Sequence, residues 1–164
     1  MMLKAIETHY KGYRFRSRLE ARWAVFFDAL KEEWRYEDEG YVLPSGLYLP
    51  DFYLPRMDCW IEVKGKPPIQ HEIELCEEIV QGSAKCMFFA RGMPGENLRV
   101  CMPKGSGIIW RACQWALDHQ DLLCAFHSSD PSPYNCIKSY KQIRIYLPSR
   151  FYNKAKWARF EYGD

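Results

Sequence analysis

Three charged side chains lie within two otherwise apolar, strand-like segments. Asp51 precedes the run 52–54, and Glu62 and Lys64 belong to the run 59–64. Because side chains alternate along a strand, Glu62 and Lys64 are expected on the same face. The connection between the two runs is short enough for a hairpin, which would carry Asp51 to the same edge of the sheet as Glu62.

Two or three carboxylates beside a lysine can support metal-assisted hydrolysis of a phosphodiester. Carboxylate oxygens hold Mg²⁺, which polarises a phosphoryl oxygen and lowers the pKa of a bound water. A nearby lysine stabilises the developing oxyanion or positions the water. Asp51, Glu62 and Lys64 are therefore candidate catalytic residues, and Glu20 could add a ligand directly or through water. The alternative is a charged strand face turned to solvent, as in many antiparallel sheets.

Glu20 lies at the start of a predicted helix. Ser17 and Glu20 have the spacing of a capping box, in which each side chain bonds the other residue's backbone N–H. The helix is expected to continue to about Glu33, with one apolar stripe formed by Leu19, Trp23, Phe26, Phe27 and Leu30. Glu20 lies on the shoulder of this stripe, so a capping role and a functional role both remain open.

The remaining elements of the first half would position these groups. Ile6–Phe15 is expected to form a short strand or hairpin, and 34–43 an edge strand. Tyr48–Leu54 and Cys59–Lys64 continue a three-stranded meander, which a helix over Ile69–Gln81 follows. The apolar run Lys85–Ala90 predicts a strand buried on both faces and parallel to 59–64. This order indicates an α/β or α+β fold, a mixed central β-sheet flanked by helices.

The second half has weaker signals. Short strands are expected over 97–102, 107–110 and 122–126, helices over Ala112–His119 and Arg150–Phe160, and a loop over 128–133. With 164 residues and no evident linker, the chain is predicted to form a single domain with a core at about 6–90 and an elaboration at about 91–164.

Composition narrows the choice of partners. A net charge of +2 means that nucleic-acid binding would depend on a local basic patch. Seven cysteines without a Cys-x-x-Cys pair, and the lack of a leader or membrane-spanning run, predict a cytoplasmic protein with reduced thiols. Zinc is not expected because knuckle spacing is missing from the residues that crowd one third of the chain, namely Cys101, Cys113, His119, Cys124, His127 and Cys136.

Three segments together carry a family resemblance. They are Phe15-Arg16-Ser17-Arg18-Leu19-Glu20-Ala21-Arg22-Trp23-Ala24, Tyr48-Leu49-Pro50-Asp51-Phe52-Tyr53-Leu54-Pro55 and Trp60-Ile61-Glu62-Val63-Lys64-Gly65. In type and order they resemble the PD-(D/E)XK nuclease superfamily, which has the restriction-endonuclease-like fold. The resemblance is greatest to small members encoded by bacteriophages and other mobile elements. It covers residues 6–90 and, loosely, the terminal helix.

The resemblance implies a Mg²⁺-dependent endonuclease acting on DNA, with Mn²⁺ as a substitute and no organic cofactor. It implies a metal site of Asp51, Glu62 and the Val63 carbonyl, with Glu20 as an outer or direct ligand and Lys64 beside the attacking water. Cutting both strands of a duplex with one site per chain would call for a homodimer. The basic residues expected to contact DNA are Lys11, Arg14, Arg16, Arg18 and Lys66.

Two alternatives to an endonuclease stay open. One is a phage factor on the same fold that binds nucleic acid or protein without cleaving. The other is a structural α/β protein in which Glu20 is only a helix cap and Glu62 only pairs with Lys64. The complete set of Glu20, Asp51, Glu62 and Lys64 favours cleavage.

Overall fold

The computed structural model describes residues 5–118, 121–126, 137–139 and 149–160. Within them it is a mixed α+β structure with three helices, α1 (Arg18–Ala29), α2 (Gln70–Ser83) and α3 (Ser149–Lys156). The strands are β1 (Thr8–Tyr10), β2 (Tyr13–Phe15), β3 (Arg35–Tyr36), β4 (Tyr41–Leu43), β5 (Gly46–Tyr48), β6 (Phe52–Leu54), β7 (Cys59–Lys64), β8 (Cys86–Arg91), β9 (Asn97–Lys104), β10 (Gly107–Asp118), β11 (Asp121–Phe126) and β12 (Ile137–Ser139).

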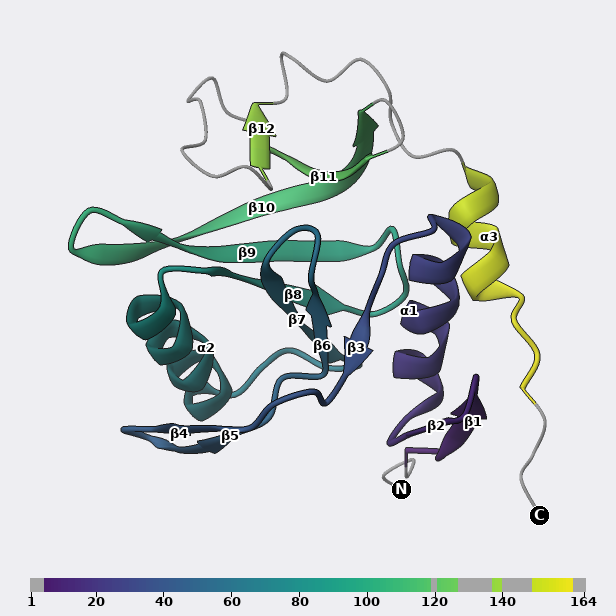
Figure 1. Cartoon of the computed structure of the whole chain (residues 1–164), viewed down its shortest axis with the longest axis horizontal. Helices are drawn as coiled ribbons and strands as arrows, with labels where there is room; N and C mark the ends of the chain where they lie inside the picture. The colour runs from purple at the N-terminus through teal and green to yellow at the C-terminus, as the bar shows by residue number, and fades with distance from the viewer. Residues whose placement is uncertain (1–4, 119–120, 127–136, 140–148, 161–164) are drawn as a thin grey trace.

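An eight-stranded sheet forms the centre of the molecule (Figure 1). Its strand order is β12-β11-β10-β9-β8-β7-β6-β3, and the hairpins β1–β2 and β4–β5 are separate two-stranded sheets. Only β7 with β8 and β11 with β12 pair in parallel within these described strands, and the other pairs are antiparallel. The predicted parallel pairing of 59–64 with the buried strand is confirmed, as is an α+β architecture.

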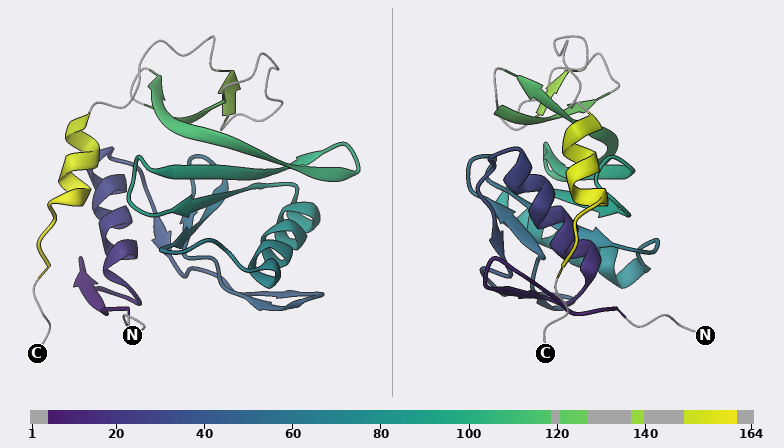
Figure 2. Two further views of the ribbon diagram at one scale, coloured as in Figure 1. Left: turned by 180° about the vertical axis from the view of Figure 1, so that it is seen from behind. Right: turned by 90° about the vertical axis from the view of Figure 1, so that its right-hand side faces the viewer.

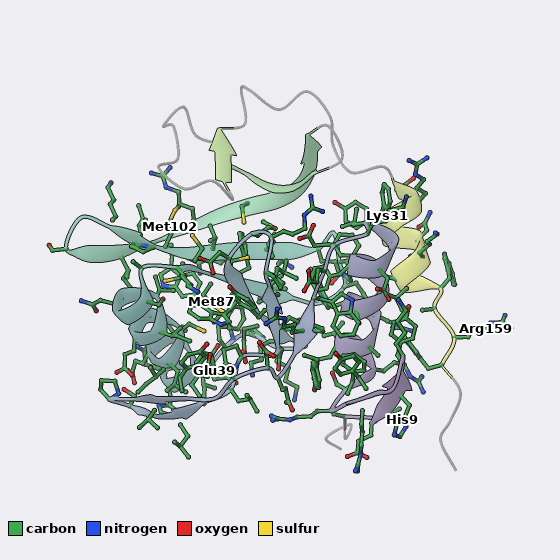
Figure 3. The ribbon with its side chains drawn as sticks, viewed as in Figure 1. His9, Lys31, Glu39, Met87, Met102 and Arg159 are labelled. Atoms are coloured by element: carbon green, nitrogen blue, oxygen red, sulfur yellow. The ribbon has the colours of Figure 1, made fainter. Side chains whose placement is uncertain are left out.

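The helices α1 and α2 cover opposite faces of this sheet. Ile61 and Val63 of β7 pack in the core cluster that contains the buried side chains of α1. Trp60, on the other face of the same strand, packs with buried residues of α2 and with Met87. Figure 3 shows Met87 inside the molecule between α2 and the sheet. The alternation predicted for β7 therefore divides the core into two layers.

The helix α3 packs beside α1, on the side away from the sheet (Figure 2). The ring of Tyr152 stacks on that of Phe26, with centroids 5.5 Å apart and an interplanar angle of 13°. The predicted terminal helix over Arg150–Phe160 was placed correctly but too long, because α3 ends at Lys156.

The helix α1 begins where the capping box predicts and ends earlier than Glu33. Ser17 is its N-cap, and Leu30 is its C-cap. Lys31 then takes a left-handed conformation with φ 58°, and the Glu32 N–H returns to the Phe27 carbonyl at 2.9 Å. These are the features of a C-terminal stop, in which backbone bonds satisfy the last carbonyls.

The predicted meander was partly wrong. Tyr48 and Phe52 belong to different sheets, because the chain leaves β5 at Leu49 and enters β6 only after Asp51. Pro50 lies in this break, where it has no N–H to donate to a ladder. The predicted edge strand 34–43 is likewise divided into β3 and β4, with Glu37 between them at φ 47°.

The helix predicted over Ala112–His119 was wrong. Residues up to Asp118 belong to β10, which pairs antiparallel with both β9 and β11. Backbone hydrogen bonds to strands on both sides outweigh the weak helical pattern of this segment, so its tertiary surroundings determine that it is a strand. The strands predicted over 97–102, 107–110 and 122–126 are confirmed as β9, β10 and β11. His119 and the loop 128–133 lie outside the described residues.

Cys59, Cys76, Cys86, Cys101 and Cys113 are buried free thiols. Of the zinc candidates, His119, His127 and Cys136 lie outside the described residues. Within the described part of the chain, no helix is long and apolar enough to cross a membrane.

Candidate functional site

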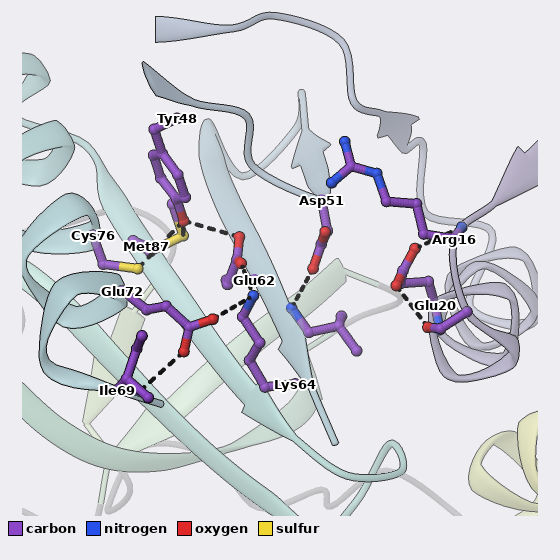
Figure 4. Close-up of polar contacts among 12 residues, drawn as sticks. Arg16, Glu20, Tyr48, Asp51, Glu62, Lys64, Ile69, Glu72, Cys76 and Met87 are labelled. Atoms are coloured by element: carbon purple, nitrogen blue, oxygen red, sulfur yellow. Dashed lines mark hydrogen bonds and ion pairs between the residues drawn. The ribbon is translucent and has the colours of Figure 1, made fainter. Parts of the chain in front are cut away.

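Asp51 and Glu62 meet at the edge between β6 and β7. The register pairs Phe52 with Ile61, so the preceding Asp51 and the following Glu62 lie opposite each other. Both side chains are buried, with relative exposures of 8% and 5%. The hairpin of β6 and β7 is confirmed, and Figure 4 shows Asp51, just before β6, next to Glu62 on β7.

The backbone of Val63 is aimed at Asp51. The Val63 N–H donates to Asp51 Oδ2 at 2.7 Å. The next residue points the other way, since the Lys64 carbonyl accepts from the Gly92 N–H at 2.8 Å. Because the N–H and C=O of one strand residue point to the same side, the Val63 carbonyl oxygen also faces the Asp51 side of β7.

Burial and neighbouring negative charges act against ionisation of Asp51. Burial raises the pKa of Asp51 well above its ordinary value, and the negative charges of Glu62 and Glu20 raise it further. The bond from the Val63 N–H and the charge of Lys64 lower that pKa without offsetting the increase. Carboxylates that are buried together and repel each other in this way are frequent at functional sites.

Lys64 is held by two carboxylates. Its Nζ lies 2.8 Å from Glu62 Oε1 and 3.0 Å from Glu72 Oε1 (Figure 4). Burial alone would lower the pKa of Lys64, but the charge of Glu62 and the bonds to Glu62 and Glu72 outweigh burial and raise it. The raised pKa means that Lys64 carries a positive charge at neutral pH.

Sequence patterns did not identify Glu72 and Tyr48 as parts of this site. Glu72 lies in the first turn of α2, and its Oε2 also accepts the Ile69 N–H at 3.0 Å. An acidic residue in the first turn after Pro68 was a signal for a helix cap, although not for contact with Lys64. Tyr48 donates its hydroxyl to Glu62 Oε2 at 2.9 Å from the separate β4–β5 hairpin. Burial raises the pKa of Tyr48, so its hydroxyl remains a donor.

Ser17 caps α1 as predicted, but among the described contacts the Glu20 side chain bonds the Ser17 hydroxyl and the Arg16 N–H and not the Ser17 N–H, so only half of the capping box is present. Glu20 Oε1 accepts from Ser17 Oγ at 2.6 Å, and Glu20 Oε2 accepts from the Tyr36 hydroxyl at 2.5 Å and the Arg16 N–H at 3.2 Å. Ser17 Oγ in turn accepts the Glu20 N–H at 3.2 Å. Glu20 lies beyond Asp51 as seen from Glu62 in Figure 4, close enough to raise the pKa of Asp51. A direct metal bond from Glu20 stays a prediction; Oε1 accepts one of these hydrogen bonds and Oε2 accepts two.

We expect Ser17→Ala to lower the free energy of unfolding by about 1 kcal/mol, since it removes the cap of α1 and one donor to Glu20. Chemical denaturation measures this change. Ser106→Ala, in the exposed turn between β9 and β10, is the control and should change stability by less than about 0.5 kcal/mol. Equal stabilities of the Ser17 variant and wild type would contradict the capping role.

Most residues of the predicted basic cluster form ion pairs with acidic side chains of the protein. Lys11 lies 2.9 Å from Asp28, Arg14 lies 2.6 Å from Glu7, and Arg16 lies 2.6 Å from Glu37. The two further members are Arg18, which is half-buried, and Lys66, which is exposed just after β7. Contact of these residues with DNA stays a prediction, and acidic neighbours offset the charge of the first three.

The oxygen atoms at this edge of the sheet are of the type that hard divalent cations prefer. Among the described residues, no group of three or more His, Cys, Asp and Glu side chains could hold a metal ion. Asp51, Glu62 and the Val63 carbonyl are two carboxylates and one carbonyl, which suits Mg²⁺ because this ion keeps several waters.

Comparisons of the chain with protein-family models, with curated proteins and with solved structures find no match.

Proposed function

We propose that the protein is a Mg²⁺-dependent endonuclease of the PD-(D/E)XK type that hydrolyses phosphodiester bonds in DNA, and that Mn²⁺ can replace Mg²⁺. One observation carries the proposal. Asp51 and Glu62 are buried side by side at a strand edge, with the Val63 backbone aimed at Asp51 and the charged Lys64 bound to Glu62. A merely structural ion pair would not explain the second buried carboxylate, whose pKa is raised.

Each residue then has a separate task. Asp51, Glu62 and the Val63 carbonyl would hold the ion, which supplies Lewis-acid polarisation of the phosphate and a bound water of lowered pKa. Lys64 places a fixed positive charge beside the phosphate, where it stabilises the charge that develops on the oxygens. Glu72 keeps the Lys64 ammonium in position, and Tyr48 orients Glu62.

Two chains are needed to cut both strands of a duplex. One site cuts one strand, so a single chain is expected to nick duplex DNA, and a homodimer with two-fold symmetry to cut both strands. Analytical ultracentrifugation at the concentration of the cleavage assay would relate nicking and double-strand cutting to the oligomeric state.

Incubation of purified wild-type protein with supercoiled plasmid tests the activity. We expect nicked or linear product with Mg²⁺ or Mn²⁺ and none with EDTA, because the two carboxylates need the ion to orient the water. The same assay is run on linear, branched and single-stranded DNA. If the protein binds DNA but cuts none of these substrates with either metal, it is a non-cleaving binder.

A further inference from the structure

A pocket of about 730 Å³ lies over β8, β9 and β10, on the face of the sheet that α2 covers. Pro67 and Pro68, which connect the end of β7 to α2, form part of its wall, and Phe89, Arg91 and Arg99 line it. Its volume is in the range of sites that enclose a small molecule or a single nucleotide. None of Glu20, Asp51, Glu62 and Lys64 lines this pocket.

The strand register connects the pocket to the candidate active site. Across the parallel pair, Lys64 is opposite Arg91 and Glu62 is opposite Phe89. Across the next pair, Phe89 is opposite Arg99. Directly paired residues share a face of the sheet. Glu62, Phe89 and Arg99 therefore lie side by side across β7, β8 and β9. Lys64 and Arg91 lie side by side in the same way, two residues further along. The exposed Arg91 at the pocket is thus the direct neighbour of the partly exposed Lys64 of the candidate site.

The positive charges of the pocket are available to a ligand. Arg91 and Arg99 are both exposed, and neither forms an ion pair within the part of the chain that the structure describes. Lys11, Arg14 and Arg16, in contrast, are each paired with an acidic neighbour. The two pocket arginines therefore match phosphate better than the cluster near the N-terminus does.

An aromatic platform is built into the same pocket. The Trp110 indole N–H donates to Glu77 Oε1 at 2.7 Å, and its ring lies 6.4 Å from that of Phe89 at an interplanar angle of 67°. The Arg99 guanidinium lies over the Trp110 ring, 5.4 Å from its centroid. These contacts come from α2, β8 and β9, and together they fix the orientation of the indole. Nucleobases stack on such rings and on guanidinium planes when they are free of a duplex.

We propose that this pocket binds one unpaired nucleotide of DNA, with its base against Trp110 and Arg99 and its phosphate near Arg91. The substrate is then single-stranded or branched DNA, because a base in an uninterrupted duplex stays stacked between its neighbours. The acidic Glu96 in the wall disfavours phosphate at its own position but can accept a hydrogen bond from the amino group of a base. This inference extends the proposed function by naming the form of the substrate.

Fluorescence anisotropy in EDTA tests the pocket, because metal-free binding does not depend on cleavage. The probes are a labelled oligothymidylate, a duplex with a single-stranded flap and an uninterrupted duplex. We expect Arg91→Gln and Arg99→Gln each to weaken binding of the first two probes by roughly 5- to 10-fold, and binding of the duplex by less than about 2-fold. Arg150→Gln, an exposed arginine on α3, is the matched control and should bind like wild type.

The outcomes separate the two proposals. The pocket assignment is overturned if the wild type does not bind the single strand, if the arginine variants bind it as wild type does, or if they weaken duplex binding equally. Mg²⁺ cleavage is measured in parallel on the same variants. Pocket-dependent binding without any cleavage supports the pocket and rejects the nuclease. Cleavage with unchanged binding in both arginine variants rejects the pocket alone.

Discussion

Glu62→Gln should reduce Mg²⁺-dependent DNA cleavage by at least about 100-fold, the loss typical when one charge-stabilising group is removed from an active site. Glutamine keeps the size of the side chain and an oxygen that can accept from Tyr48. It loses the negative charge that would bind the ion and that holds the Lys64 ammonium at 2.8 Å. Initial rates of plasmid nicking at saturating Mg²⁺ measure the effect.

The matched control is Glu74→Gln, the same substitution on the surface of α2, where Glu74 bonds Gln70 and lies 4.0 Å from His71. Its nicking rate should stay within about 2-fold of wild type, since surface changes of this kind have small effects. Circular dichroism and thermal unfolding confirm that both variants fold. Undiminished cleavage by folded Glu62→Gln would remove Glu62 from the active site.

Asp51→Asn should make the metal-free protein more stable at neutral pH, by about 1 to 3 kcal/mol. The asparagine oxygen can still accept the Val63 N–H, while the buried charge that Glu62 and Glu20 repel is gone. In the presence of Mg²⁺, the wild type should instead be more stable than Asp51→Asn. At 100 times its dissociation constant, a ligand that binds only the folded state adds about 2.7 kcal/mol, and the variant would not gain this.

The stability difference between wild type and Asp51→Asn should depend on pH. The pKa of folded Asp51 is raised well above 3.8, so the folded state holds this proton more tightly than the unfolded state does. That contribution to stability is complete below the pKa of the unfolded chain and is lost as pH rises through the raised pKa. The advantage of the asparagine variant should therefore shrink as pH falls from neutral toward 3.8.

Urea denaturation with EDTA and with Mg²⁺, at several pH values, measures both effects. Asp38→Asn removes an exposed carboxylate that lies 3.3 Å from Arg35, and it should show neither the stabilisation nor the loss of the Mg²⁺ response. An Asp51 variant that is less stable than wild type in EDTA, or that gains as much from Mg²⁺, would show that Asp51 neither suffers repulsion nor binds the ion.

Local patterns were sufficient for many individual elements. The capping box at Ser17 and Glu20 located the start of α1, and alternation along β7 predicted the face shared by Glu62 and Lys64. The short connection 55–58 predicted the hairpin that joins Asp51 to this strand. These predictions succeeded because each depends on bonds between residues that are close in the chain. The helix predicted over Ala112–His119 failed because two neighbouring strands determine the state of that segment.

The sequence by itself determined the candidate residues, in the order Glu20, Asp51, Glu62 and Lys64, and it placed Glu20 on the first helix and Glu62 and Lys64 on one strand. Only the tertiary structure decided how their charges are balanced. Tyr48 and Glu72 reach Glu62 and Lys64 from a separate hairpin and a helix, and Tyr36 takes up one oxygen of Glu20. Within the described residues, Arg91 and Arg99 form no ion pair, whereas Lys11, Arg14 and Arg16 each pair with an acidic side chain. Burial and pairing depend on packing between elements distant in sequence, so no spacing in the chain encodes them.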